Sequence, residues 1–294
     1  MKNWLKKNGA GYLFLLPWLI GTLIFTIIPI FTSLYLSFTN YNILNPAHFI
    51  GFQNYSRIFT DKKFITSLIV TFKFVLFSVP LQLSFALFIA ILLNKGIAGL
   101  RIYRAVYYIP SLLGGSVAIS ILWRQIFNKE GLINDILSKL GIKGINWIAT
   151  PSTALYTLIL LAVWQFGSSM LIFLSALKQV PMELYESAEI DGASGLRKFV
   201  SITFPMITPI VFFNLIMQVI NAFQSFNSAY IISGGNGGPL DSTLLYSLYL
   251  YQKGFSNFEM GYASALAWIL LIIIGSVIGL IFVTSKKWVY NQDE

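Results

Sequence analysis

The sequence predicts an all-α, polytopic membrane protein with six transmembrane helices, and two observations lead to this fold class. Hydrophobic side chains make up 56% of the 294 residues and charged side chains only 11%, whereas a soluble domain usually carries about a quarter charged residues. The apolar residues also gather in six long runs, and a hydrocarbon core of about 30 Å needs about 20 apolar residues in a helix. Helices are expected for all six runs because a helix satisfies its own backbone in lipid.

The predicted spans form one membrane domain over residues 1–294 and lie, in order, at 11–39, 66–94, 104–127, 153–177, 205–231 and 261–284. The first follows a basic stretch, as in a signal peptide, but it exceeds an apolar core of about 7–15 residues and no cleavage site follows, so we expect an uncleaved span. Prolines lie inside the first, second, third and fifth spans. Kinked spans are tolerated where neighbouring helices or a cavity satisfy the freed carbonyls, which favours a bundle with an interior path.

The distribution of positive charge predicts the orientation of these spans. With six spans, both termini lie on one side, together with residues 95–103 and 178–204. These segments, with Arg104 at a span edge, hold 11 Lys and Arg, and the other three connections hold eight over a greater length. The bias places both termini in the cytoplasm. Residues 178–204 then form the longest cytoplasmic loop.

Composition excludes several classes of function. The net charge of +9 sits in short clusters beside apolar runs, as orienting charges do, so no nucleic-acid partner is expected. The absence of cysteine excludes disulfides and Cys-based zinc sites, and a single histidine leaves no His cluster for a metal. Without a catalytic constellation, we predict no enzyme activity, no cofactor and no metal.

An ion-coupled secondary transporter is the alternative from another class. Such carriers commonly place a carboxylate within their spans. All eleven Asp and Glu residues of this chain fall in loops, at span edges or in the tail, which weighs against that mechanism.

Polar side chains form a stripe on the fifth predicted span and another on the fourth. The stripes consist of Asn214, Gln218, Asn221 and Ser225 on the fifth span, and of Gln165, Ser168 and Ser169 beside Trp164 on the fourth. The spacing on the fifth span puts its four residues within about 60° of one another on a helix. Neutral donors and acceptors next to aromatic rings suit a polyol, whose C–H faces stack on rings. Interhelical hydrogen bonding is the other interpretation.

The loop at 178–204 carries its own pattern. Glu183, Glu186 and Glu189 lie three residues apart, as on one side of a helix. Gly192 suits a helix end or turn, and Ser194 is placed to cap a second short helix. We therefore predict a helix–turn–helix, acidic first and basic second, beneath the membrane.

The same loop resembles the "EAA" loop of ATP-binding-cassette importer permeases, in which Glu-Ala-Ala is followed by three residues, Gly, nine residues and Ile-x-Leu-Pro. This chain has Glu186-Ser187-Ala188, then Gly192, then Ile202-Thr203-Phe204-Pro205 at the same spacing, with Asp191 before the glycine. Ser187 and Phe204 depart from the pattern, but the glutamate, glycine and proline are kept. The resemblance to the maltose/glycerol-phosphate type of sugar permease extends over nearly the whole chain, for example in "YRAVYYIPSLLGGSVAISILWRQIFNKEGLIN".

The resemblance implies the type I ABC importer permease fold in a bacterial plasma (inner) membrane. It also implies a heterodimer with a second permease, a cytoplasmic ATPase dimer, and an extracellular or periplasmic sugar-binding protein that delivers a carbohydrate such as an oligosaccharide. A polyol or a sugar phosphate remains an alternative substrate. By resemblance, Glu186 contacts the ATPase, Gly192 forms the turn that fits its groove, and the fourth and fifth spans line the sugar site.

Residues 232–243, "ISGGNGGPLDST", are rich in glycine but do not form a phosphate-binding loop, because Gly-Lys-Ser/Thr is missing. By resemblance, Gly237, Gly238 and Pro239 belong to the last external loop, which faces the binding protein. A flexible turn is the other interpretation.

Overall fold

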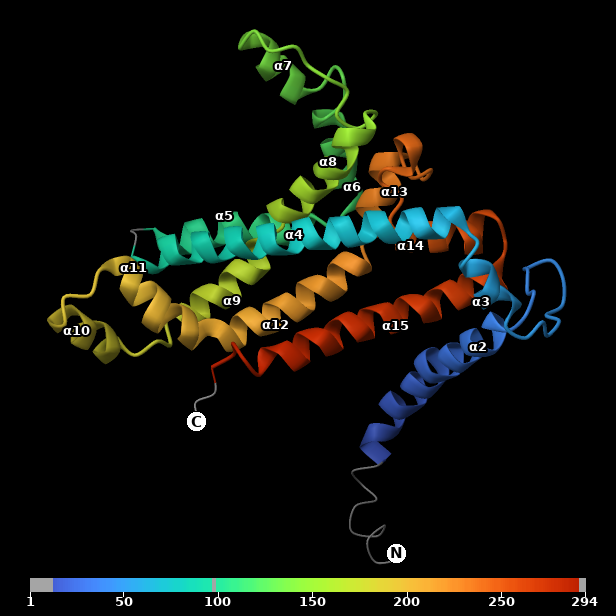
Figure 1. The fold of residues 1–294 in the computed structure, drawn as a ribbon, viewed down its shortest axis with the longest axis horizontal. Helices are drawn as coiled ribbons and strands as arrows, with labels where there is room; N and C mark the ends of the chain where they lie inside the picture. The colour runs from blue at the N-terminus through green and yellow to red at the C-terminus, as the bar shows by residue number, and fades with distance from the viewer. Residues whose placement is uncertain (1–12, 97–98, 291–294) are drawn as a thin grey trace, which may run out of the picture. The chain divides into compact units, whose positions relative to one another are not determined.

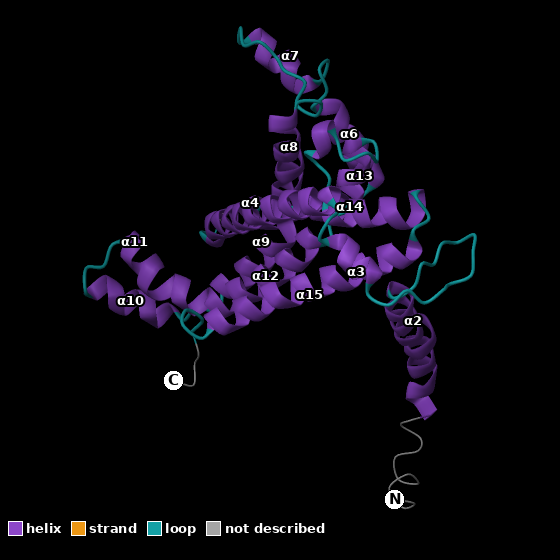
Figure 2. Ribbon diagram, turned by 45° about the vertical axis from the view of Figure 1, so that its right-hand side comes forward, coloured by secondary structure: helices purple, strands orange, loops and turns teal. Residues whose placement is uncertain are grey.

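The computed structural model of the chain describes residues 13–96 and 99–290. Within these ranges all regular structure is helical, apart from two isolated β-bridges, Thr39–Phe49 and Asn42–Asn45 (Figure 2). The basic stretch at 1–10 and the start of the first predicted span lie outside the described residues.

The helices follow one another along the chain as shown in Figure 1. A first long helix covers Leu13–Ser37 and ends in α2 (Ile28–Ser37). After it come α3 (Gln53–Ile58), α4 (Lys62–Asn94), α5 (Leu100–Leu113), α6 (Val117–Ile126), α7 (Leu132–Lys139), α8 (Pro151–Trp164), α9 (Gly167–Leu177), α10 (Met182–Ile190), α11 (Gly195–Lys198), α12 (Phe204–Phe223), α13 (Asn227–Ser233), α14 (Tyr246–Tyr251) and α15 (Met260–Ser285).

The chain divides into two compact units. One holds residues 1–61 and 250–271, and the other holds 62–249 and 272–294. In the first unit, an ion pair at 2.5 Å joins Arg57 to Glu259, and the Tyr262 hydroxyl donates to Asp61 at 2.7 Å. The Asn54 amide donates to the carbonyl oxygens of Ser37 and Thr39, so the end of the first helix is tied to α3.

The second unit is organised around α4, which packs against α8, α9 and α12. Its buried face carries small side chains, among them Ser67, Thr71, Ala86 and Ala90. Small residues let neighbouring backbones approach closely, which is the usual basis of helix packing in membranes. The small residues of α4 thus allow close packing, while larger buried side chains such as Phe74 and Leu83 fill the remaining space.

Three of the predicted spans contain breaks that the hydrophobic pattern does not reveal. The third span consists of α5 and α6, which meet at 97°, and the fourth consists of α8 and α9, which meet at 42°. The fifth predicted span is not one helix either, because α12 ends at Phe223 and α13 starts at Asn227. Counting each bent pair as one, the described residues hold up to six helices or pairs long and apolar enough to cross a membrane.

The break in the third span does not lie at its proline. Pro110 is inside α5, and its carbonyl accepts the N–H of Gly114, which closes that helix. Ser116 then adopts an extended conformation, and its hydroxyl accepts the N–H of Ile119 at 3.3 Å, so it caps α6. A helix end followed directly by a new N-cap produces the sharp bend.

Residues 178–204 form the predicted helix–turn–helix. After α10, Gly192 adopts a φ of +70°, and the N–H of Ala193 donates to the carbonyl of Ala188, which is the usual way a left-handed residue ends a helix. The Ser194 hydroxyl accepts the N–H of Arg197 and caps α11. The chain continues from α11 into α12, so that Gly195–Phe223 is one long helical segment.

Gly167 should be sensitive to any added side-chain atom. A Cβ there would meet the Tyr107 carbonyl oxygen, Tyr108 Cα at 2.8 Å and Ser111 Oγ at 3.0 Å, whereas a Cβ on Gly275 meets nothing within 4 Å. We expect Gly167→Ala to lower the free energy of unfolding by about 1–3 kcal/mol, as overpacking does. Gly275→Ala is the matched control and should be neutral or stabilising by about 0.5–1 kcal/mol. Thermal unfolding in detergent measures both, and equal midpoints would contradict the close approach of α5 and α9.

Candidate functional site

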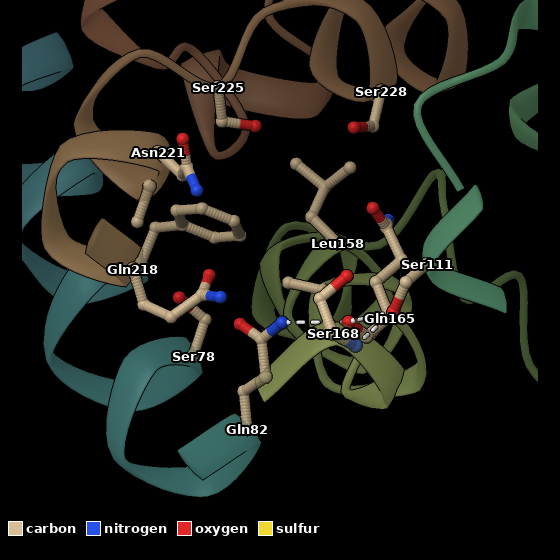
Figure 3. A pocket seen from close by; sticks show the side chains of 13 residues that line it. Ser78, Gln82, Ser111, Leu158, Gln165, Ser168, Gln218, Asn221, Ser225 and Ser228 are labelled. Carbon is tan, nitrogen blue, oxygen red and sulfur yellow. Dashed lines mark hydrogen bonds between the residues drawn. The ribbon is translucent and has the colours of Figure 1, made fainter. Parts of the chain in front are cut away.

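A cavity of about 260 Å³ lies in the second unit (Figure 3). Its wall is built by α4, α5, α8, α9, α12 and α13. The lining residues are Phe74, Ser78, Gln82, Ser111, Leu158, Ala162, Gln165, Ser168, Gln218, Asn221, Ala222, Ser225 and Ser228. The polar members of this set are hydroxyls and primary amides, and none of the lining side chains is ionisable.

All three helix breaks of this unit contribute to the cavity or its rim. Gln165 lies at the break between α8 and α9, Ser225 at the break between α12 and α13, and Ser111 in the last turn of α5 before its break. The amide of Asn227 donates to the carbonyl of Gly115 at 3.5 Å, which links two of the breaks directly. In lipid, irregular backbone is tolerated where it is buried in protein or lines a cavity.

The carbonyl of Gln165 is the centre of this arrangement. It accepts the Gln82 amide at 3.1 Å and the Ser111 hydroxyl at 2.9 Å, as the dashed lines in Figure 3 show. The Ser111 oxygen in turn accepts the N–H of Ser168 at 2.9 Å. Side chains of α4 and α5 thus satisfy backbone groups that the break between α8 and α9 leaves without helical partners.

Gly114 makes room for the Gln165 side chain. A Cβ on Gly114 would overlap the side-chain atoms of Gln165. The amide nitrogen of Gln165 donates to the carbonyl of Leu161 at 3.2 Å. Because Gly114 has no side chain, the break between α5 and α6 leaves the space that the Gln165 side chain occupies at the break between α8 and α9.

Five of the eight residues predicted for the pathway line this cavity, namely Gln165, Ser168, Gln218, Asn221 and Ser225. Ser169 is buried behind them, where its hydroxyl accepts the Gln218 amide at 3.0 Å. The other two lie elsewhere. Trp164 packs against Trp123 with ring centroids 5.8 Å apart, and Asn214 is buried and donates to Ile210 of its own helix.

Several lining residues were missed by the sequence reasoning, most clearly those on α4. Phe74, Ser78 and Gln82 recur every four residues, which places them along one side of that helix. This spacing was a usable signal, hidden because the run is strongly apolar on average. Ser78 is buried, and its hydroxyl has no hydrogen-bond partner among the described residues.

The α10–α11 loop presents large apolar side chains to solvent. Ile190, beside the turn, is 88% exposed, and Leu196 is 75% exposed. Glu186 is exposed on α10. The tip of the loop thus carries both exposed apolar and exposed charged side chains.

An ion pair holds the two helices of this loop together. The Lys198 ammonium donates to Glu189 Oε1 at 2.6 Å. The hydrogen bond and charge of Lys198 lower the pKa of the Glu189 carboxyl. The acidic first helix and basic second helix of the sequence therefore meet across the turn.

Hydrogen bonds connect the end of the motif to the first helix of the loop and to α12. Thr203, between Ile202 and Phe204, is buried, and its hydroxyl forms a 2.7 Å hydrogen bond with the Tyr185 hydroxyl. Pro205 opens α12, where its carbonyl accepts the hydroxyl of Thr208. Ser187 hydrogen-bonds to the Glu183 carbonyl, so this departure from the alanine of the motif is accommodated within α10.

The turn at 237–239 is closely packed. Gly237 and Gly238 have φ values of +90° and +74°, and the Gly237 carbonyl accepts both the N–H and the hydroxyl of Thr243 at 2.9 Å. After Pro239, the Leu240 side chain is 88% exposed. The glycines shape the turn, and Leu240 is the side chain that the turn presents.

Comparisons with known proteins agree with a transport role. The model of the family described as "binding-protein-dependent transport system inner membrane component" matches residues 58–288. The probable ABC transporter permease protein YesP of Bacillus subtilis (strain 168) is 53% identical, covering 98% of this chain and 94% of its own length. The arabinooligosaccharides transport system permease protein AraP of the same organism is 35% identical over 92% of this chain and 86% of its own.

A third relative is the trehalose/maltose transport system permease protein MalF of Thermococcus litoralis, which is 32% identical over 92% of this chain and 91% of its own length. Among solved structures, a chain of a bacterial alginate ABC transporter, in complex with an alginate pentasaccharide-bound periplasmic protein, has a TM-score of 0.85 at 20% identity. That match covers 98% of this chain and 97% of that chain. The fold is therefore that of an ABC importer permease.

The family match extends over most of the sequence, and the relatives align along nearly all of it. The chain, a helical bundle with broken spans and a neutral polar cavity, therefore belongs to the family of binding-protein-dependent transport system inner membrane components.

Proposed function

We propose that the chain is a permease subunit of an ATP-driven importer of uncharged carbohydrates, with oligosaccharides as the main substrates. The cavity carries this proposal, because its hydroxyls and amides stand where the three broken helices meet and no ionisable side chain lines it. Sugar hydroxyls need such partners. The relatives named for arabinooligosaccharides and for trehalose/maltose support the same substrate class.

The importer would also contain the partners that this chain lacks. A second permease would complete the pathway as a heterodimer, two copies of a cytoplasmic ATPase would supply the energy, and an external or periplasmic sugar-binding protein would deliver the substrate. The subunit would lie in the bacterial inner membrane with both termini in the cytoplasm, so that Gly237, Gly238 and Pro239 hold Leu240 toward the binding protein. The solved alginate transporter, which is in complex with a periplasmic protein, supports this kind of assembly.

The α10–α11 loop would transmit the movement of the ATPase to the spans. Its exposed Ile190 and Leu196 supply an apolar contact, Glu186 and Asp191 supply charge, and the turn at Gly192 sets the shape. Because the loop continues without a break through Ile202 and Pro205 into α12, a displacement of the loop reaches the helix that carries Gln218 and Asn221. This is a rigid-body mechanism for alternating access.

Polar replacement of the loop's apolar side chains should uncouple the importer. Leu196→Ser and Ile190→Ser should each reduce copurification of the ATPase and sugar uptake by about tenfold or more, because burying such a side chain is worth about 1.5–3 kcal/mol. Glu186→Lys and Gly192→Leu should have the same effect, with membrane insertion unchanged. Pull-down of the ATPase and uptake of labelled sugar measure this.

Two variants serve as matched controls for the loop. Leu140 is 70% exposed at the end of α7, on the predicted external side, so Leu140→Ser should leave ATPase binding intact. Glu130→Lys makes the charge change of Glu186→Lys on the same external connection. If the loop variants and these controls behaved alike, the coupling role would be excluded.

Loss of amides from the cavity should weaken sugar transport selectively. Gln218→Leu and Asn221→Leu should each raise the KM for uptake by about 3- to 10-fold, since one hydrogen bond contributes about 0.5–1.5 kcal/mol. Asn214→Leu makes the same kind of change outside the cavity and should leave the KM unchanged. An equal KM in all three variants would assign these amides to helix packing alone.

Uptake competition identifies the substrate. In a strain deleted for this gene and complemented with it, unlabelled neutral oligosaccharides should compete best with labelled sugar. Sugar phosphates and uronic-acid oligosaccharides should compete poorly, because no cation lines the cavity. Strong competition by a sugar phosphate would overturn the uncharged substrate class.

A further inference from the structure

A second, smaller pocket lies between α5 and α9, apart from the cavity described above. It measures about 220 Å³ and is lined by Arg104, Leu171, Leu174, Ser175 and Lys178. Arg104 is on α5, and the other four residues follow one side of α9 down to its C-terminal end. Two cationic side chains thus share one pocket with two leucines and a hydroxyl.

The guanidinium of Arg104 lacks the partners that a buried cation requires. Its Nε and one terminal nitrogen are buried, and neither has a hydrogen-bond partner among the described residues. A buried charged donor left unpaired costs free energy. The negative end of the α9 dipole favours a cation nearby, but it does not supply acceptors for these two nitrogens.

The surrounding helices provide no negative charge to compensate the two cations. The sequences of α4, α5, α8, α9 and α12 contain no Asp or Glu. None of the ion pairs within the described part of the chain involves Arg104 or Lys178. An anion from outside the chain is therefore the natural occupant of the pocket.

The wall of the pocket is also suited to the apolar atoms of a lipid. Leu171 and Leu174 of α9 line it beside the two cations. Lys178 begins the segment that we propose to be cytoplasmic, so the pocket would lie at headgroup depth in the inner leaflet. Basic pockets between spans on that side bind anionic headgroups.

We infer that Arg104 and Lys178 form a binding site for the phosphodiester headgroup of an anionic phospholipid, with the Ser175 hydroxyl as a further donor. The bidentate geometry of a guanidinium matches two phosphate oxygens, and Leu171 and Leu174 supply the apolar part of the site. The depth assigned to this site rests on the orientation proposed above. The site itself takes no part in sugar binding.

Native mass spectrometry of the purified full-length subunit in its importer complex tests this inference. The complex is titrated with palmitoyl-oleoyl phosphatidylglycerol or with phosphatidylcholine of the same acyl chains. We expect at least about tenfold tighter binding of phosphatidylglycerol, since each cation near an anionic headgroup adds about a fivefold factor and the pocket holds two. Arg104→Gln and Lys178→Gln should each remove most of this preference. Lys139→Gln, on α7, should keep it.

Three results would overturn the lipid site. The first is equal binding of both lipids to the wild type, or an unchanged preference in both variants. The second is displacement of phosphatidylglycerol by millimolar inorganic phosphate, which would indicate a site for free anions. The third is loss of the second permease from the Arg104→Gln complex, which would indicate a subunit contact.

The assay separates this inference from the transport function, because it contains no ATP and no sugar. The preference for phosphatidylglycerol can be lost while sugar uptake remains, and sugar uptake can be lost while the preference remains. Lys178 is exposed, so Lys178→Gln tests the site even if Arg104→Gln disturbs folding.

Discussion

The structure of the second unit depends on one requirement. Where a helix is interrupted in lipid, its backbone N–H and carbonyl groups must still find hydrogen-bond partners. Each break between α5 and α6, α8 and α9, and α12 and α13 frees carbonyl and N–H groups that hydrocarbon cannot satisfy. The protein meets this requirement with side chains from neighbouring helices, most clearly where Gln82 and Ser111 both donate to the Gln165 carbonyl. Because one break is stabilised by residues next to another, the breaks gather in one place. The cavity is a consequence of that gathering.

The same requirement gives the polar side chains of the cavity two roles. Gln82, Ser111 and Ser169 are engaged with other protein groups, so they hold the helices in position. The exposed Asn221 makes no such bond within the described chain, and its amide can exchange water for a substrate hydroxyl. A site of this kind combines a rigid frame with a few adaptable donors and acceptors, which suits ligands that differ in the arrangement of their hydroxyls.

The sequence predicts the helical class, the apolar segments and the local structure of the 178–204 loop, because each depends on composition or on short-range capping. It does not predict where the spans break. The bend at 114–116 combines a local cap at Ser116 with the close approach of Gly114 to Gln165, and that contact joins residues far apart in the chain. The stripe on α4 was missed because that run is strongly apolar on average. Asn214 and Trp164 lie outside the cavity, and helical spacing alone cannot tell a cavity from a packed interface.

The apolar tip of the α10–α11 loop also bears on how the cell handles this subunit. Ile190 and Leu196 are exposed in the isolated subunit, and in the proposed importer the ATPase would cover them. A copy that reached the membrane without its partner would therefore display apolar side chains to the cytoplasm, the feature by which chaperones and proteases recognise unfinished proteins. Removal of unassembled copies would then set the ratio of the subunits after synthesis. The same apolar surface would serve for docking in the complete importer and for recognition of an incomplete one.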